Sequence, residues 1–147
     1  MIFDEMTEFC DATSATINIG NAILGDVVDL GATPTLRDIG NGEPLYLVLQ
    51  VTTAFAGAGA TVTFDLCSDS TANLATSKTT HLSTGAIPVA NLAVGKQYSF
   101  ALPHGATYER YLGLWETVAA TNLSAGAVNA FLTRDVALAT AYPDYTA

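Results

Sequence analysis

The stretch that decides the fold is Tyr108-Glu-Arg-Tyr-Leu-Gly-Leu-Trp-Glu-Thr-Val118. Successive side chains of a β-strand point to opposite faces, so Leu112, Leu114 and Val118 share one face. Only Glu116 interrupts this apolar set, and the opposite face is largely aromatic. A strand that is at least half covered on both faces belongs in the middle of a sandwich, between a second sheet and another neighbour.

Short apolar runs of the same kind repeat on both sides of this strand and are separated by turns rich in Gly, Pro and Asn. We expect further strands at residues 16–20, 27–30, 45–53, 60–66, 78–82, 97–102 and 127–133. The strand at 78–82 is expected at a sheet edge. Between the strands we expect a turn at Gly25-Asp26, a surface loop over 67–77 and an apolar segment over 87–94 that Pro88 breaks.

About eight short strands without a long helix are typical of an antiparallel sandwich or barrel. The number favours a jelly roll over an immunoglobulin-type sandwich, whose Cys-Trp-Cys spacing is missing here. We therefore predict one all-β domain over residues 1–147, an antiparallel jelly-roll β-sandwich of about eight strands. Its predicted buried set is Leu45, Leu47, Val62, Phe64, Phe100, Leu112 and Leu114.

The two ends of the chain carry aromatic residues in segments without a clear strand pattern. Residues 1–15 are acidic and are expected to form an N-terminal arm, and residues 134–147 a C-terminal tail. Chain ends are usually poorly ordered unless something holds them, so aromatic residues there suggest contact with a neighbour. The candidate interaction residues are Phe3, Phe9, Tyr142 and Tyr145.

Charge and composition exclude several classes of partner. Five basic residues face fourteen acidic ones, for a formal net charge of −9, so no basic stripe exists to neutralise the phosphates of a nucleic acid. The same charge disfavours an anionic membrane surface, and no run of 18 apolar residues predicts a membrane span. Only 13% of the residues are charged, against about 25% in an average soluble protein, which favours a component of an assembly.

The N-terminal sequence carries acids where a signal peptide needs positive charge, so we expect a protein made in a cytoplasm. In that reducing compartment Cys10 and Cys67 are expected to be two buried thiols without a disulfide between them.

Catalytic and metal-binding patterns are weak in this sequence. His81 and His104 are the candidates for a catalytic base, but no nucleophile motif accompanies them, and we predict no catalytic residues and no cofactor. Asp65, Asp69 and Asn73 offer oxygen ligands for Ca²⁺ without the spacing of an EF-hand loop. Zinc is less favoured, because the cysteines and histidines show no paired spacing. We predict no metal.

A sugar-binding or receptor-binding jelly roll is the alternative that the residues leave open. Such a module stacks sugars on exposed aromatic side chains. The candidates for this platform are Tyr46, Tyr98, Tyr108, Tyr111 and Trp115. Most of them fall inside alternating strands, where burial in a core or an interface is the simpler explanation.

Five segments in this order resemble the capsid cement, or decoration, proteins of tailed bacteriophages, the family typified by the cement protein of a Bordetella phage. These segments are Phe9-Cys-Asp-Ala12, Val27-Val-Asp-Leu-Gly31, Arg37-Asp-Ile-Gly-Asn-Gly-Glu-Pro-Leu-Tyr46, Glu109-Arg-Tyr-Leu-Gly113 and Ala125-Gly-Ala-Val-Asn-Ala-Phe-Leu132. Each motif alone is weak, but together they span nearly the whole chain.

The resemblance implies a jelly-roll structural protein on the outer surface of a shell built from an HK97-like major capsid protein, where it clamps neighbouring capsomers. It implies a location in the virion, and in the host cytoplasm during assembly. It also implies self-association, with a homodimer favoured and a trimer possible. No catalytic residues are implied.

Overall fold

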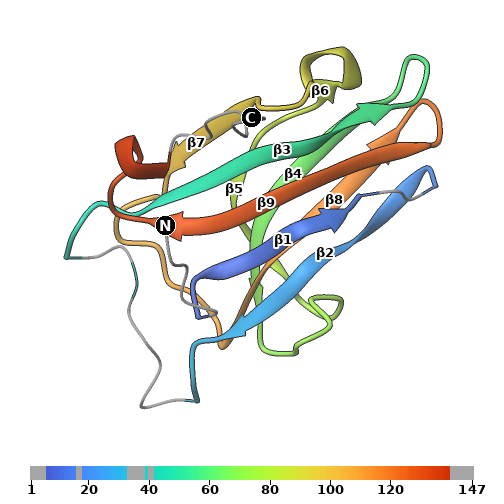
Figure 1. Ribbon diagram of the computed structural model, residues 1–147. Coiled ribbons are helices and arrows are strands. Elements are labelled where there is room, and N and C mark those ends of the chain that lie inside the picture. The colour runs from blue at the N-terminus through green and yellow to red at the C-terminus, as the bar shows by residue number, and fades with distance from the viewer. Residues whose placement is uncertain (1–5, 16–17, 33–38, 40–41, 140–147) are drawn as a thin grey trace.

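In the computed structural model, the described residues are 6–15, 18–32, 39 and 42–139, and they form two antiparallel sheets packed face to face (Figure 1). Sheet A contains, in spatial order, β1 (Glu8–Ser14), β9 (Ala125–Thr133), β3 (Tyr46–Ala56) and β7 (Gln97–Ala101). Sheet B contains β2 (Gly20–Asp29), β8 (Tyr111–Ala119), β4 (Thr61–Asp69) and β5 (Thr79–Ser83), and the short β6 (Ile87–Pro88) also pairs with β4. Two 3₁₀ turns, η1 (Val89–Asn91) and η2 (Ala137–Ala139), complete the elements.

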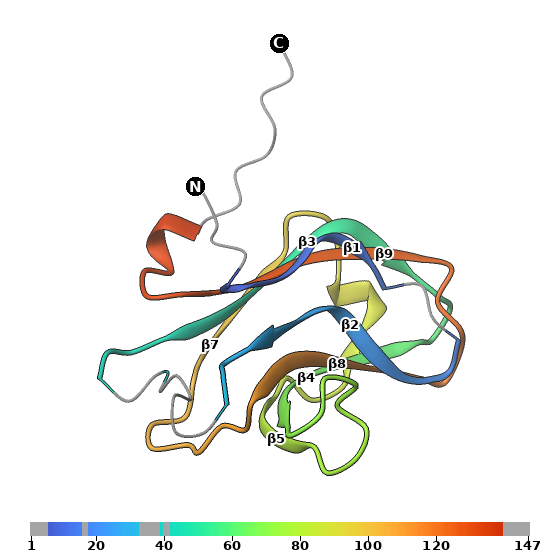
Figure 2. The same ribbon diagram turned by 90° about the horizontal axis from the view of Figure 1, so that it is seen from below.

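The order of the strands confirms the jelly roll. The spatial order is β1, β9, β3, β7 in sheet A and β2, β8, β4, β5 in sheet B. Strands that follow one another in the chain, such as β1 and β2, β3 and β4, or β8 and β9, therefore occupy matching places in the two sheets. Figure 2 shows the two layers edge on. The sheets therefore form a long hairpin rolled up on itself, as in the double Greek key of jelly rolls. Within the described residues, no helix has the length and apolar character needed to cross a membrane.

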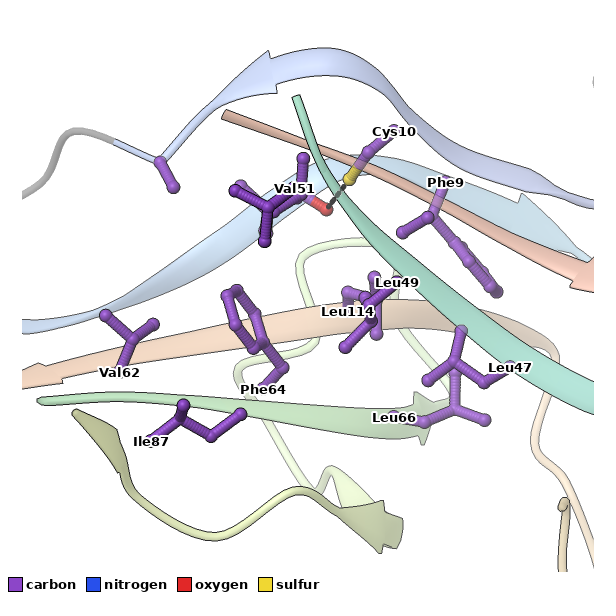
Figure 3. Packing of buried hydrophobic residues seen from close by; sticks show 14 of the residues in the cluster. Phe9, Cys10, Leu47, Leu49, Val51, Val62, Phe64, Leu66, Ile87 and Leu114 are labelled. Atoms are coloured by element: carbon purple, nitrogen blue, oxygen red, sulfur yellow. Dashed lines mark hydrogen bonds between the residues drawn. The ribbon is translucent and has the colours of Figure 1, made fainter. Parts of the chain in front are cut away.

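The core fills the space between the two sheets (Figure 3). Of the predicted set, Leu47, Val62, Phe64, Leu112 and Leu114 are at most 1% exposed, while Leu45 and Phe100 are half-buried and pack against the same cluster. The Phe55 and Phe64 rings meet edge to face with their centroids 6.1 Å apart, the arrangement that aromatic pairs prefer.

β8 lies between β2 and β4, as predicted for a central strand. Its inward row is Leu112, Leu114, Glu116 and Val118, so the acid that interrupts the apolar pattern lies inside the sandwich. Trp115 faces the opposite side and is half-buried, with the Lys78 ammonium 4.2 Å from its ring centroid. The edge position predicted for residues 78–82 is confirmed by β5, the last strand of sheet B.

The prediction of an N-terminal arm over residues 1–15 is wrong for residues 8–15. Glu8–Ser14 is the strand β1 at the edge of sheet A, and Phe9 and Cys10 are each 1% exposed in the core. Irregular pairing with β9 on both sides of Cys10 breaks the strict alternation, so two consecutive residues lie inward and the usual strand pattern is lost. Phe9 therefore offers no surface to a neighbouring molecule.

The turn predicted at Gly25-Asp26 is instead a bulge inside β2, located between Leu24 and Val28. Gly25 has φ +74°, and a Cβ on it would lie 2.0 Å from the Phe9 carbonyl oxygen and 2.6 Å from Cys10 Sγ. Glycine is therefore required here, because the backbones of β1 and β2 approach each other closely. The loop predicted over 67–77 also begins later, since residues 67–69 belong to β4.

Replacing Gly25 with Ala tests this close approach. Gly59 is a matched control with φ +77° and no atom within 4 Å of an added Cβ. Gly59→Ala should cost about 1–2 kcal/mol through backbone strain alone. Gly25→Ala should cost about 1–3 kcal/mol more because the new methyl overpacks the contact with β1. Urea unfolding of the two variants measures the difference, and equal midpoints would show that the contact tolerates a methyl group.

Candidate functional site

The first candidate site is a polar cluster where β4, β5 and the loop before β8 meet. Ser68 Oγ lies 2.7 Å from His81 Nε2 and accepts a 3.0 Å hydrogen bond from the Glu109 N–H. The His81 and Tyr108 rings are in contact, with their centroids 4.4 Å apart. Burial lowers the pKa of His81, and nearby Glu109 acts in the opposite direction. The imidazole is therefore neutral at pH 7.

A serine beside a histidine, with a carboxylate close by, is the first requirement of a nucleophile and its base. Ser68 is 0% exposed, however, so its hydroxyl has no face open to a substrate. His104, the other candidate base, is exposed in the turn before β8 and is not part of this cluster. The geometry supports a structural role, in which hydrogen bonds of Ser68 connect Glu109 to the β4–β5 hairpin.

The second candidate is the predicted oxygen-ligand set in and after β4. Asp69 is 0% exposed and accepts hydrogen bonds from the loop that follows it. Its donors are the N–H groups of Thr71, Thr76 and Ser77 and the hydroxyls of Ser70 and Thr71, at 3.1–3.2 Å. Asn73 Oδ1 is likewise bonded to the Thr71 hydroxyl and the Ala75 N–H.

The carboxylate of Asp69 therefore acts as a hub that folds the loop between β4 and β5. Burial alone would raise its pKa, but the backbone N–H groups and the Ser70 hydroxyl lower it to about 2. Leu74, at the tip of the loop, is 0% exposed and packs over Gly113 of β8. In the described part of the chain no three His, Cys, Asp or Glu residues gather as metal ligands do.

Replacing Asp69 with Asn tests the hub. A group whose pKa is lowered on folding stabilises the protein above its unfolded pKa and loses that effect as the pH falls through the folded value. The wild type should therefore be more stable than Asp69→Asn at pH 7, and the gap should close between about pH 4 and pH 2. Urea unfolding across this range measures the gap.

Hydrogen exchange provides the control for the same experiment. The Thr76 and Ser77 amides should exchange faster in Asp69→Asn, because both donate to the lost carboxylate oxygen. Asp65→Asn, on the same strand, should leave them unchanged. Equal exchange in wild type and Asp69→Asn would contradict the hub.

The aromatic residues expected to form a sugar platform do not lie on one surface. Tyr108 is buried, and Tyr98 points inward from sheet A, where its hydroxyl donates to the Asn91 carbonyl oxygen at 3.0 Å. On sheet B, Trp115 lies beneath Lys78, and the Arg110 guanidinium sits 4.9 Å from the Tyr111 ring centroid. The Trp115 and Tyr111 rings are thus each in contact with a cationic side chain of the protein itself.

The outer face of sheet A is the candidate interaction surface. β3, β7 and β9 contain no Asp, Glu, Lys, Arg or His, although the chain carries a net charge of −9. Because Ser99 pairs with Val48 and Ala101 with Tyr46, these side chains share the outer face, and Ser99 and Ala101 are exposed. The edge strand β1 of the same sheet carries Glu8 and Asp11, and β2 and β4 of sheet B each carry two aspartates, of which Asp69 is buried.

Part of this outer face is covered by the segment that follows β9. Val48 and Phe131 are 0% exposed because Val136 and Ala139 pack over them, and η2 lies on this side of the molecule (Figure 2). Gln50, in the middle of β3, donates a hydrogen bond from Nε2 to the Ala139 carbonyl oxygen. The start of the predicted tail thus lies against sheet A.

The interaction residues predicted from the sequence fall into two groups. Phe9 is in the core, as described above. Phe3, Tyr142 and Tyr145 lie outside the described residues. The interactions that sequence reasoning missed are those of Ser68 and Gln50, and the only signal for Gln50 was a polar residue within the apolar run of β3.

The chain matches a model of a known protein family. This model, described as Bbp16, covers residues 9–132, from the second residue of β1 to the last residue but one of β9. No curated protein matches the chain.

Proposed function

The chain belongs to the Bbp16 family, the capsid cement proteins typified by that of a Bordetella phage, and from this premise we propose how it acts. It binds the outer surface of an expanded HK97-like capsid shell and clamps neighbouring capsomers. It is a structural component of the virion and assembles there from the host cytoplasm. The observation that carries this proposal is the family match over most of the chain, including nearly every strand of the sandwich.

The contact surface that we propose is the outer face of sheet A. Every subunit carries a net charge of −9, so charged faces would repel one another on a crowded shell. The strands β3, β7 and β9 instead offer hydroxyl, amide and methyl groups without charge. Such a face fits a polar-neutral protein surface, and attachment through it should survive high salt.

Introducing charge at Ser99 tests this surface. Ser99→Lys and Ser99→Glu should both weaken binding to expanded capsids by about tenfold or more. Either charged side chain would be desolvated in the contact without an oppositely charged partner. Ser83, an exposed serine on the edge strand β5 of sheet B, provides the matched controls Ser83→Lys and Ser83→Glu. Cosedimentation with capsids that lack the protein measures binding.

The two signs of charge separate the possible outcomes. Weakening by both charges at Ser99, and by neither at Ser83, supports a neutral contact at sheet A. If Lys and Glu at Ser99 have opposite effects, the partner is recognised by charge and the proposed surface chemistry is wrong. If no variant binds less than wild type, the contact lies elsewhere on the molecule.

We propose further that the chain self-associates, with a homodimer favoured over a trimer, and that Phe3, Tyr142 and Tyr145 contact neighbours. A stable interface buries about 1,000 Å² or more, and aromatic residues contribute strongly to such contacts. Since β1 begins at Glu8 and Ala139 packs on sheet A, a truncation that tests these contacts must leave the segment from β1 to Ala139 intact.

Truncation at the two ends of the chain is the corresponding test. Removing residues 1–5, 140–147 or both should leave the unfolding midpoint close to that of wild type but lower the oligomer mass and the occupancy on expanded capsids. Light scattering and cosedimentation measure the two effects. If all truncated forms associate and bind like the full chain, the proposed terminal contacts do not exist.

A further inference from the structure

The inward face of β8 carries one ionisable residue, Glu116, among apolar neighbours. It is 1% exposed and lies between Leu114 and Val118, with Phe64 of β4 paired opposite it. In the described residues its Oε1 atom has no hydrogen-bond partner. A buried carboxylate without partners is strongly unfavourable, whereas the neutral acid is tolerated more easily. Burial accordingly raises the pKa of Glu116 to about 8.

Among the described residues, no positive charge acts on this carboxyl, and burial is the only cause of the shift. The negative charges of Asp26, Glu116 and Glu8 act on the Cys10 thiol of β1. Burial, together with these charges, raises the pKa of Cys10 to about 12. The inward side chains of β3, β4 and β9 belong to the apolar cluster. Lys78 and Arg110 are engaged elsewhere, with Trp115 and Asp29 respectively.

Glu116 lies near the edge where β1 and β2 bring the two sheets together. These strands belong to different sheets, so no ladder of backbone hydrogen bonds joins them in the described structure. Their contact consists of close packing around Gly25 and a 3.5 Å hydrogen bond from the Cys10 thiol to the Leu24 carbonyl oxygen (Figure 3). Each of the two strands also pairs irregularly within its own sheet, β1 with β9 and β2 with β8.

We propose that Glu116 is a pH-sensitive element of the fold, whose ionisation opens the seam between β1 and β2 so that water reaches the carboxylate. The neutral acid is favoured in the closed sandwich, and the ionised form is more stable in the open one. The inference is independent of the proposed capsid function, since it concerns the isolated chain.

The direction of the pH effect follows from the two states of the carboxyl. In the open form the acid titrates near its ordinary pKa of 4.5, and in the closed form near 8. Opening therefore becomes more favourable by about tenfold for each pH unit between these values and levels off above the higher one. Below pH 4.5 both forms are neutral, and the closed sandwich is at its most stable relative to the open form.

The two cysteines provide a readout that separates local opening from global unfolding. Cys10 lies at the seam, whereas Cys67 is a buried thiol in β4, which β8 separates from β2. Labelling of each thiol, followed by mass spectrometry of the peptides, gives its rate of exposure in wild type and in Glu116→Gln. Because the variant cannot ionise, the ratio of wild-type to variant rates removes the intrinsic pH dependence of the thiol reaction.

For Cys10 this ratio should rise by about tenfold per pH unit between pH 5 and pH 8 and then become constant, while the ratio for Cys67 should stay flat. A flat ratio at Cys10 would overturn the proposal, and an equal rise at both thiols would show global unfolding instead of an opening at the seam. Carbon-13 NMR of the Glu116 carboxyl in the wild type needs no variant. A midpoint near 8 supports the proposal, and one near 4.5 overturns it.

Discussion

The structure depends on the packing of inward side chains between the two sheets. β8 occupies the middle of this arrangement, because it pairs with β2 on one side and β4 on the other and directs its inward row at sheet A. Burial of large apolar side chains such as Phe64 and Leu114 drives this packing, at roughly 1.5–3 kcal/mol for each side chain. The remaining features are arranged around that layer.

Polar groups inside the molecule are accommodated in three ways. Asp69 accepts so many hydrogen bonds from its own loop that the charged form is favoured. Ser68 is bonded on two sides, by His81 and by the backbone of Glu109. For Glu116 no described residue bonds to Oε1, so burial favours the neutral acid. The pKa is therefore lowered at Asp69, which has hydrogen-bond donors, and raised at Glu116.

Three of the four strands of sheet A carry no charged residue. β3, β7 and β9 present neutral groups, whereas the edge strand β1 carries Glu8 and Asp11, and β2 and β4 of sheet B carry aspartates. The segment that follows β9 packs on this neutral face through Val136 and Ala139. This neutral part of sheet A belongs to a subunit with a net charge of −9.

The sequence by itself determined the fold class, the central position of β8 and most of the core, because alternation with period two is a local property that survives in any sandwich. It also carried the family resemblance. Only the tertiary structure decided the role of Glu8–Ser14 and of Gly25, since bulges in β1 and β2 break the alternation where the two sheets meet. The same holds for Glu116, Ser68 and Asp69, because their environments are set by distant strands and loops that no local pattern encodes.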